Sequence, residues 1–349
     1  MKPNLAHVLA VLAAGIVSAS AASGAAESPP VDPNLPAYAP RTSGITPPQG
    51  TSYVLRDGSI HIEGAEHADF ILERLDALFA KTHPGFSFTL NLKGTGTSIP
   101  ALTHGITPFA PMGRAVTPIE LVPYAKIVGE NPLEIKVAHT AFASKKLATS
   151  LAVYVNAANP IDKLSLDEVA RMYTAGNPGG DITSWGQVGE AGEWKTARVR
   201  PISGFAHAGF GNYETAKFHN RPFSSHMEPY ADTAQILERV GQDRFAVGIA
   251  ASGRTDPGIK CVALAEKAGG DYSIGSRDDV TNNKYTLGRY LYFYVRREPG
   301  KPLDPFVKEY FRMMLSRDGQ QIIASQADGY LPLTAHDAAE ELAKLEEVK

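Results

Sequence analysis

The sequence contains a single cysteine, Cys261, among 349 residues. One thiol cannot form an intramolecular disulfide, and it cannot be half of a paired-cysteine metal or redox motif. The chain also lacks a dense basic run, because 34 Lys and Arg are balanced by 37 Asp and Glu, for a net charge of -3. Nucleic-acid binding needs clustered Lys and Arg to neutralise phosphates. These absences exclude a disulfide scaffold, a zinc ribbon and an iron–sulfur protein, and they argue against nucleic acid as a partner.

No uncharged apolar run reaches the ~20 residues needed to cross a bilayer. The N-terminal apolar stretch from Leu5 to Val17 is shorter; Lys2 precedes it, and small residues with A-x-A-like cleavage points follow at 18–26. This pattern predicts a cleavable signal peptide over residues 1–26. No cysteine follows the stretch, which excludes a lipid anchor on a processed N-terminal cysteine. We therefore expect a periplasmic or secreted protein without a stable membrane anchor.

Residues 27–52 contain seven prolines. Proline at this density disfavours helices and interior strands. We therefore predict an extended leader that lies along the surface of the folded protein.

Beyond residue 53, helical and strand patterns alternate. Apolar residues recur at helical spacing over 70–80, and residues 86–92 alternate with period two. Capping boxes at Thr117–Glu120 and Ser165–Glu168 predict two further helix starts. Further strands are predicted over 134–140, 151–155, 198–202, 245–250 and 290–295. This alternation predicts an α/β protein with mostly parallel sheets.

The strongest binding motif is the segment Gly94–Ser98, directly after the alternating strand and at a predicted helix start. Gly94 and Gly96 allow a ligand to approach the backbone, and the hydroxyls of Thr95, Thr97 and Ser98 lie beside free helix amides. The segment therefore fits an anion site, with an ordinary strand-to-helix turn as the alternative. It lacks the glycine pattern of a dinucleotide or nucleotide loop, and the histidines lack metal-ligand spacing, so we expect no cofactor and no metal.

Eight motifs, in a fixed order along nearly the whole chain after about residue 58, carry a family resemblance. They are Gly94–Gly105, Phe109–Arg114, Leu151–Pro160, Leu164–Tyr173, Ile182–Gly189, Pro302–Lys308, Leu315–Gln320 and Gly329–Leu333. These motifs resemble those of the periplasmic phosphate-binding proteins of ABC uptake systems.

The resemblance implies a type II periplasmic-binding-protein fold, a two-lobed α/β Venus-flytrap with two chain crossings between the lobes. It places lobe 1 at residues 53–148 plus 262–349 and lobe 2 at residues 149–261. It also implies a small-molecule ligand, phosphate or an organic molecule, that is captured in the cleft between the lobes and delivered to a membrane ABC permease.

Four loops line the phosphate site in this family, and three of them differ in this chain. The first loop has Ala65 and His67 where the family has hydroxyl residues, with the acidic Glu66 between them. The third keeps the guanidinium of Arg114 without the neighbouring hydroxyl. The fourth, counted from Ser203, has Phe205, His207 and Phe210 in place of the family's arginine, aspartate and hydroxyl trio. These positions, together with Thr95, Gly96, Thr97 and Ser98 of the second loop, are the candidate ligand-binding residues.

A desolvated phosphate dianion needs many hydrogen-bond donors. Only the Gly94–Ser98 loop and Arg114 supply them clearly, whereas Phe205 and Phe210 favour an apolar cleft wall. We therefore hypothesise an organic ligand with one anionic or polar end, with His67 and His207 able to donate or titrate. The alternative is that Phe205 and Phe210 are core residues and that the loop is displaced by a residue or two.

Three functions remain open. The first is the solute receptor of an uptake system, and the second is a sensor or scavenger that presents its ligand to a partner protein. The third, a secreted hydrolase, lacks a recognisable nucleophile–base pair, since Ser203-Gly204 followed by His207 gives no evidence of triad geometry. We expect a binding protein and no enzyme.

Overall fold

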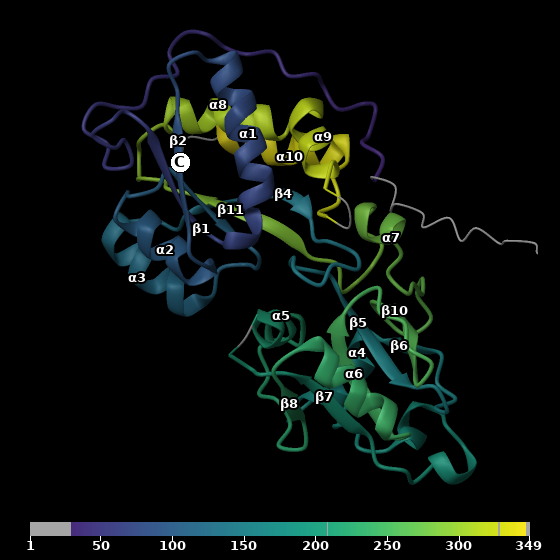
Figure 1. Ribbon diagram of the computed structural model, residues 1–349. Helices are drawn as coiled ribbons and strands as arrows, with labels where there is room; N and C mark the ends of the chain where they lie inside the picture. The colour runs from purple at the N-terminus through teal and green to yellow at the C-terminus, as the bar shows by residue number, and fades with distance from the viewer. Residues whose placement is uncertain (1–28, 208, 327–328, 347–349) are drawn as a thin grey trace, which may run out of the picture.

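The computed structural model describes residues 29–207, 209–326 and 329–346. Figure 1 shows two lobes joined at a narrow waist, one containing α1–α3 and α8–α10, the other containing α4–α6. We call these the first and the second lobe. The predicted signal peptide at 1–26 lies outside the described residues.

The first lobe is built on two small sheets. β1 (Ile60–Gly64) pairs in parallel with β2 (Phe88–Leu92), and the other sheet has the order β3-β11-β4. The strands of that second sheet are β3 (Phe109–Met112), β4 (Leu133–His139) and β11 (Tyr290–Val295). The helices of the lobe are α1 (Asp69–Thr82), α2 (Thr95–Thr103), α3 (Pro118–Val128), α8 (Pro305–Met314), α9 (Arg317–Ala324) and α10 (Ala335–Glu346), with a 3-10 turn at Glu66–Ala68.

Local sequence explains these helices well. α1 buries Ile71, Leu72, Leu75 and Phe79, whose spacing places them on one helical face against the core. α3 begins at the predicted capping box, where Glu120 accepts hydrogen bonds from the amide and the hydroxyl of Thr117. The predicted helices at 70–80 and after residue 117 are therefore confirmed.

The second lobe contains one six-stranded sheet with the order β6-β10-β5-β9-β7-β8. Its strands are β5 (Leu151–Asn156), β6 (Lys163–Ser165), β7 (Arg200–Gly204), β8 (Glu228–Tyr230), β9 (Ala246–Ala251) and β10 (Ile259–Ala265). Its helices are α4 (Leu166–Tyr173), α5 (Gly209–Lys217), α6 (Thr233–Gln242) and α7 (Arg277–Thr281), with 3-10 turns at Trp185–Val188 and Gly192–Trp194.

Helices cover both faces of this sheet. α6 packs Ile236 and Val240 against one face, and α4 packs Val169 and Tyr173 into the cluster on the other face. The capping box that starts α4 is present, with Ser165 accepting from the Glu168 amide and donating to its carboxylate. A sheet with helices on both faces places its strand ends, and the loops that follow them, at exposed edges.

The expectation of mostly parallel sheets is wrong. Of the eight strand pairings in the described residues, four are parallel and four are antiparallel. β11 and β5 account for the difference, because each pairs antiparallel with both of its neighbours. Each lies next to a segment that passes between the lobes, so its direction is set by a long-range crossing that local patterns do not encode.

The two crossings between the lobes run side by side. The Thr140 amide donates to the Arg289 carbonyl at 3.0 Å, and the Leu151 amide donates to the Leu287 carbonyl at 3.2 Å. The chain thus leaves the first lobe after β4 and returns to it before β11. A division at residue 262 would cut β10, which pairs with β5 and β6 of the second lobe. We propose that the return crossing lies after Leu287, which packs in the second lobe's core.

The proline-rich leader follows the surface of the first lobe, where Figure 1 shows it in purple. Between residues 29 and 52 it forms no helix or strand. It is nevertheless held firmly, because the Leu35 side chain is completely buried in the first lobe's core. The Tyr38 hydroxyl and the Arg41 amide both donate to Oε1 of Glu309, at 2.8 and 2.9 Å.

Candidate functional site

Three of the four predicted loops meet at the carboxyl ends of β1, β2 and β3. The Ala65 amide donates to the Pro111 carbonyl at 3.0 Å, and the Gly94 amide donates to the Gly64 carbonyl at 3.0 Å. The Ser98 hydroxyl donates to the same Pro111 carbonyl at 2.8 Å. Ligand sites of α/β proteins commonly lie in a crevice beyond the carboxyl ends of strands.

The second loop forms the first turn of α2. Gly94 precedes the helix with φ of 120°, a backbone conformation that favours glycine, and no side chain caps the helix. The Thr97 hydroxyl donates to the Gly94 carbonyl at 3.1 Å, so this hydroxyl and that of Ser98 are used internally. The backbone amides of Thr95 and Gly96 have no acceptor within the helix, so they are the donors that this turn offers a ligand.

The first loop places Glu66 and His67 beside that turn. Glu66 is exposed, and its Oε2 atom lies 3.6 Å from where a Cβ on Gly94 would be. The His67 ring packs against Gly113, with a buried Nε2 atom that has no hydrogen-bond partner. Burial lowers the pKa of His67; the charge of Glu66 opposes this effect, and that of Arg289 adds to it.

Arg114, the predicted anion-binding cation of the third loop, is paired with another side chain. Its two terminal nitrogens donate to the two carboxylate oxygens of Glu120, both at 2.8 Å. Glu120 is the residue that completes the capping box of α3. The guanidinium of Arg114 is therefore directed to the helix start, and its charge is neutralised there.

The fourth loop divides into a buried and an exposed part. The Ser203 hydroxyl donates to Oε1 of Glu214 at 2.6 Å, and both residues are completely buried. Burial raises the pKa of Glu214 to about 8. Phe205 is 40 % exposed and stacks on the exposed His207 ring, with 5.7 Å between the ring centroids.

Phe210 behaves differently from Phe205, because it packs against the second lobe's core. The proposal that it is a core residue therefore applies to Phe210 and not to Phe205. Phe210 and the neighbouring Gly209 also line a cavity.

One residue that the sequence did not single out lies where these loops meet. The Arg289 guanidinium donates from Nη1 to the Thr149 carbonyl at 3.0 Å and from Nη2 to the Gly113 carbonyl at 3.2 Å. The Tyr213 ring of α5 lies 5.1 Å from its Cζ atom, and the Tyr213 hydroxyl donates to the Gly288 carbonyl. Arg289 thus touches the first lobe, a crossing segment and the second lobe. A lone arginine just before a predicted strand gave no spacing signal by which to find it.

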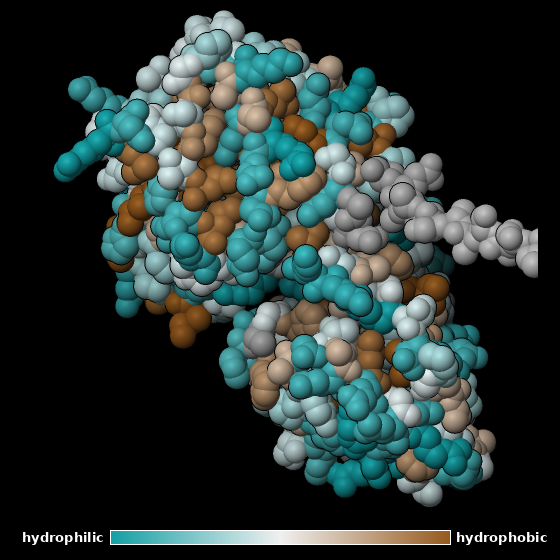
Figure 2. Space-filling view, in the orientation of Figure 1, coloured by the Kyte–Doolittle hydropathy of each residue, from teal (hydrophilic) through white to brown (hydrophobic). Residues whose placement is uncertain are grey.

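Two cavities are candidates for the ligand. One, of about 1090 Å³, is lined by the crossing segment 144–149, by Gly204, Gly209 and Phe210, and by the start of α6. It shares Thr149 with the surroundings of Arg289. Figure 2 shows the narrowing of the molecule between the two lobes.

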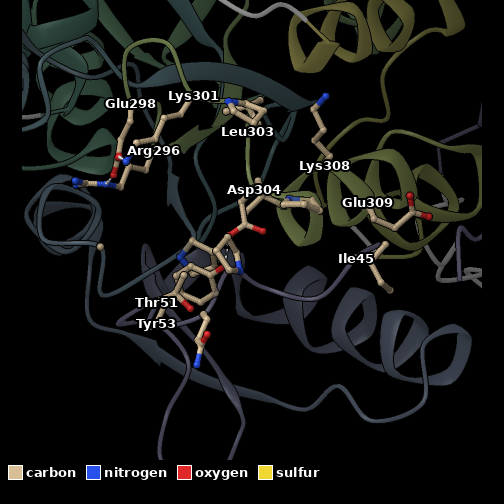
Figure 3. A pocket seen from close by; sticks show the side chains of 18 of the residues that line it. Ile45, Thr51, Tyr53, Arg296, Glu298, Lys301, Leu303, Asp304, Lys308 and Glu309 are labelled. Atoms are coloured by element: carbon tan, nitrogen blue, oxygen red, sulfur yellow. Dashed lines mark hydrogen bonds and ion pairs between the residues drawn. The ribbon is translucent and has the colours of Figure 1, made fainter. Parts of the chain in front are cut away.

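The other cavity, of about 870 Å³, lies between the leader and the first lobe, and Figure 3 shows it from close by. Its labelled charged groups are paired: Glu298 contacts Arg296 at 3.2 Å and Lys301 at 2.6 Å. The Tyr53 hydroxyl bonds to Asp304. All of its lining residues belong to the leader and the first lobe, so it does not join the predicted loops.

The PBP superfamily domain matches residues 42–318. The chain belongs to the PBP superfamily. It is homologous to the phosphate-binding protein PstS of Pseudomonas aeruginosa, with 27% identity over 98% of both chains. A phosphate-binding protein PstS of Staphylococcus haemolyticus is 22% identical over 74% of this chain and 77% of its own. The predicted family is therefore confirmed.

Solved structures of PBP superfamily proteins share the two-lobed fold. An ABC-type phosphate transport receptor from Vibrio cholerae aligns with a TM-score of 0.53 at 20% identity, over 78% of this chain and 99% of the other. PstS from Borrelia burgdorferi aligns with a TM-score of 0.54 at 17% identity, over 79% and 99%. The predicted two-lobed α/β fold is confirmed by this likeness.

No helix among the described residues is long and apolar enough to span a membrane. Within the same residues, no group of three or more His, Cys, Asp or Glu side chains is arranged to hold a metal ion.

Proposed function

We propose that this protein is an exported solute-binding protein that captures a small anion between its two lobes and delivers it to a membrane ABC permease. The observation that carries the proposal is the convergence of both lobes on one place. Gly113 of the first lobe and Tyr213 of the second both contact Arg289. The uncapped start of α2 is joined to β3, which leads into Gly113, by the Ser98–Pro111 hydrogen bond. Free helix amides attract anions. Ligands that touch both lobes favour their closure, because they bind the closed form better.

Inorganic phosphate is the first candidate ligand. The Pseudomonas aeruginosa relative that matches over 98% of both chains is named a phosphate-binding protein. The loops nevertheless offer phosphate fewer free donors than the motif order alone suggests, because Thr97, Ser98, Arg114 and Ser203 all have internal partners. Binding would need some of these side chains to exchange partners when the ligand arrives.

An organic anion with an apolar part is the second candidate. The observation that favours it is Phe205, which is 40 % exposed on the fourth loop although large aromatic side chains are usually buried. An exposed aromatic ring beside an anion site can pack against the apolar part of a ligand. Thr95 and Gly96 would then receive the anionic end.

The test uses mature protein that has been unfolded and refolded to remove carried-over ligand. Its thermal stability is measured with inorganic phosphate, phosphate monoesters and small carboxylic acids, each up to millimolar concentration. A ligand at a hundred times its Kd adds about 2.7 kcal/mol to the free energy of unfolding. Stabilisation by phosphate supports the first candidate, and stabilisation by an organic anion that Phe205→Ala reduces supports the second. If none of these anions stabilises the protein, anion capture is wrong.

Delivery to a permease is tested in cells. Deleting the gene should reduce uptake of the radiolabelled ligand, and unchanged uptake with a lost response to the ligand would favour the sensor or scavenger. Catalysis has no support in the fourth loop, because the Ser203 hydroxyl is buried and bonded to Glu214. Turnover of ester or phosphoester substrates that a single substitution at this site abolished would overturn the assignment as a binding protein.

A further inference from the structure

Arg289 is a buried cation without a counter-ion. The residue is 4 % exposed, and among the described residues no carboxylate lies within 4.0 Å of its guanidinium. A guanidinium carries five N–H donors. Two of them reach the Thr149 and Gly113 carbonyls, so most of the donor capacity of Arg289 is not used by the protein.

The groups around Arg289 do not supply the missing negative charge at neutral pH. Glu214 is a nearby carboxyl group whose charge would act on Arg289. Burial raises the pKa of Glu214 to about 8, which favours its neutral form. Tyr213, Tyr292 and Tyr330 also surround the guanidinium, and burial raises the pKa of each phenol, so all three remain neutral. His67 has a lowered pKa and adds no positive charge. The Arg289 guanidinium is therefore left without a charged carboxylate in contact with it.

An isolated buried charge is costly, and buried charges in proteins are as a rule paired or bound to a ligand. We propose that Arg289 binds the negative charge of the ligand directly, and that it is the cation that makes the space between the lobes selective for anions. This inference rests on the proposed function and names the residue that performs it. The ligand class is a small oxyanion, either inorganic phosphate or the phosphate or carboxylate end of an organic molecule.

The position of Arg289 explains how this chain can bind an anion although the fourth loop lacks an arginine. Arg114 cannot fill the role as it stands, because its charge is neutralised by Glu120. Arg289 lies directly before β11 on the return crossing, and its hydrogen bond to Gly113 places it against the third loop. Planar guanidinium groups match the two oxygens of a phosphate or carboxylate.

The experiment measures phosphate and carboxylate affinities of wild-type protein, Arg289→Lys and Arg289→Gln by calorimetry on refolded protein. We expect Arg289→Gln to lose at least about 30-fold in affinity for whichever anion binds, since removing one partner of a buried charge pair has effects of this size. Arg289→Lys keeps the positive charge but lacks the paired N–H donors of a guanidinium, and it should lose less affinity than Arg289→Gln. Arg171→Gln is the matched control, because Arg171 also donates to two backbone carbonyls, those of Gly179 and Gly180, on the second lobe. The control should bind within about twofold of wild type.

Two outcomes separate this inference from the proposed function. If wild-type protein binds no anion, the proposed function fails. If wild-type protein and folded Arg289→Gln bind equally well, only the role of Arg289 fails. Should Arg289→Gln not fold, a crystal structure of wild-type protein with phosphate decides: an oxygen at about 3 Å from a guanidinium nitrogen supports the inference, and an anion out of reach of Arg289 overturns it.

Discussion

Ser203 and Glu214 form a hydrogen bond of 2.6 Å in which both side chains are completely buried. The second carboxyl oxygen of Glu214 is buried without a partner. A charged carboxylate in such a place is strongly disfavoured, and its pKa rises to about 8 from the ordinary value of 4.5. The folded protein therefore holds a proton on Glu214 that the unfolded chain releases at neutral pH.

This proton makes stability depend on pH. Because the folded pKa is the higher one, the stabilising effect is complete below about pH 4.5 and is lost as the pH rises to about 8. The free energy of unfolding should fall over this range by up to about 1.4 kcal/mol per pH unit from Glu214 alone. Glu214→Gln should remove this part of the slope and should be more stable than wild type above pH 8. Urea unfolding of both proteins between pH 5 and 8.5 measures the difference.

Asp76 is the internal reference for that experiment. Burial raises its pKa to about 7, so it produces a slope of the same sign in both proteins. Subtracting the two curves isolates Glu214, and parallel curves would show that Glu214 is already ionised in the fold.

Substituting alanine for two glycines of the predicted loops should change the folding stability in opposite directions. A Cβ on Gly113 would lie 2.2 Å from Nε2 of His67, so Gly113→Ala must displace a packed ring and should cost about 1–3 kcal/mol. A Cβ on Gly96 meets nothing within 4 Å and lies in a helix, so Gly96→Ala should stabilise the protein by about 0.4–1 kcal/mol. Denaturant midpoints of the two variants test the packing of the first loop on the third. Equal effects would contradict it.

Arg114 should matter for stability more than for binding. Its bidentate bond to Glu120 is largely shielded, with side-chain exposures of 19% and 16%. A double-mutant cycle with Arg114→Ala and Glu120→Gln should give a coupling energy of about 1 kcal/mol. The affinity of Arg114→Ala for the bound anion should change less than that of Arg289→Gln. The reverse order of affinities would show that Arg114 leaves Glu120 to contact the ligand.

The leader should contribute to folding stability. Leu35→Ala removes a completely buried side chain from the first lobe's core and should cost about 2–5 kcal/mol. Ile127 is 59 % exposed on α3, so Ile127→Ala is the control and should change stability by less than about 0.5 kcal/mol. Guanidinium unfolding of both variants provides the comparison. Equal midpoints would mean that the leader is not held on the first lobe in solution.

Local patterns in the sequence predicted most of the secondary structure. The apolar spacing of α1, the capping boxes of α3 and α4 and the alternation of β2 each depend on neighbours within a few residues. The partner of a strand is a long-range choice, which is why local patterns do not show that β10 pairs with β5 and β6. The mostly apolar segment 259–265 carries no local signal of which lobe's sheet it joins.

The candidate site divides in the same way. The first three loops lie together in the structure, because each follows one of the strands β1, β2 and β3. The hydrogen-bond partners and the burial of the individual side chains could not be predicted from the sequence. No motif shows that the Arg114 guanidinium binds Glu120 six residues along the chain, that Phe210 packs inward while Phe205 faces outward, or that Arg289 is buried. The contacts of Arg289 are with Thr149 and Gly113, which lie more than a hundred residues away in the chain.

The hydrogen bond from Tyr213 to the Gly288 carbonyl fastens α5 of the second lobe to the entrance of β11. Any rotation of the lobes that preserves this bond must pivot close to Arg289. Atoms near a pivot move little, so Gly113, which accepts a hydrogen bond from Arg289, would move little in such a rotation. The anion contact proposed for Arg289 would then be preformed in the free protein.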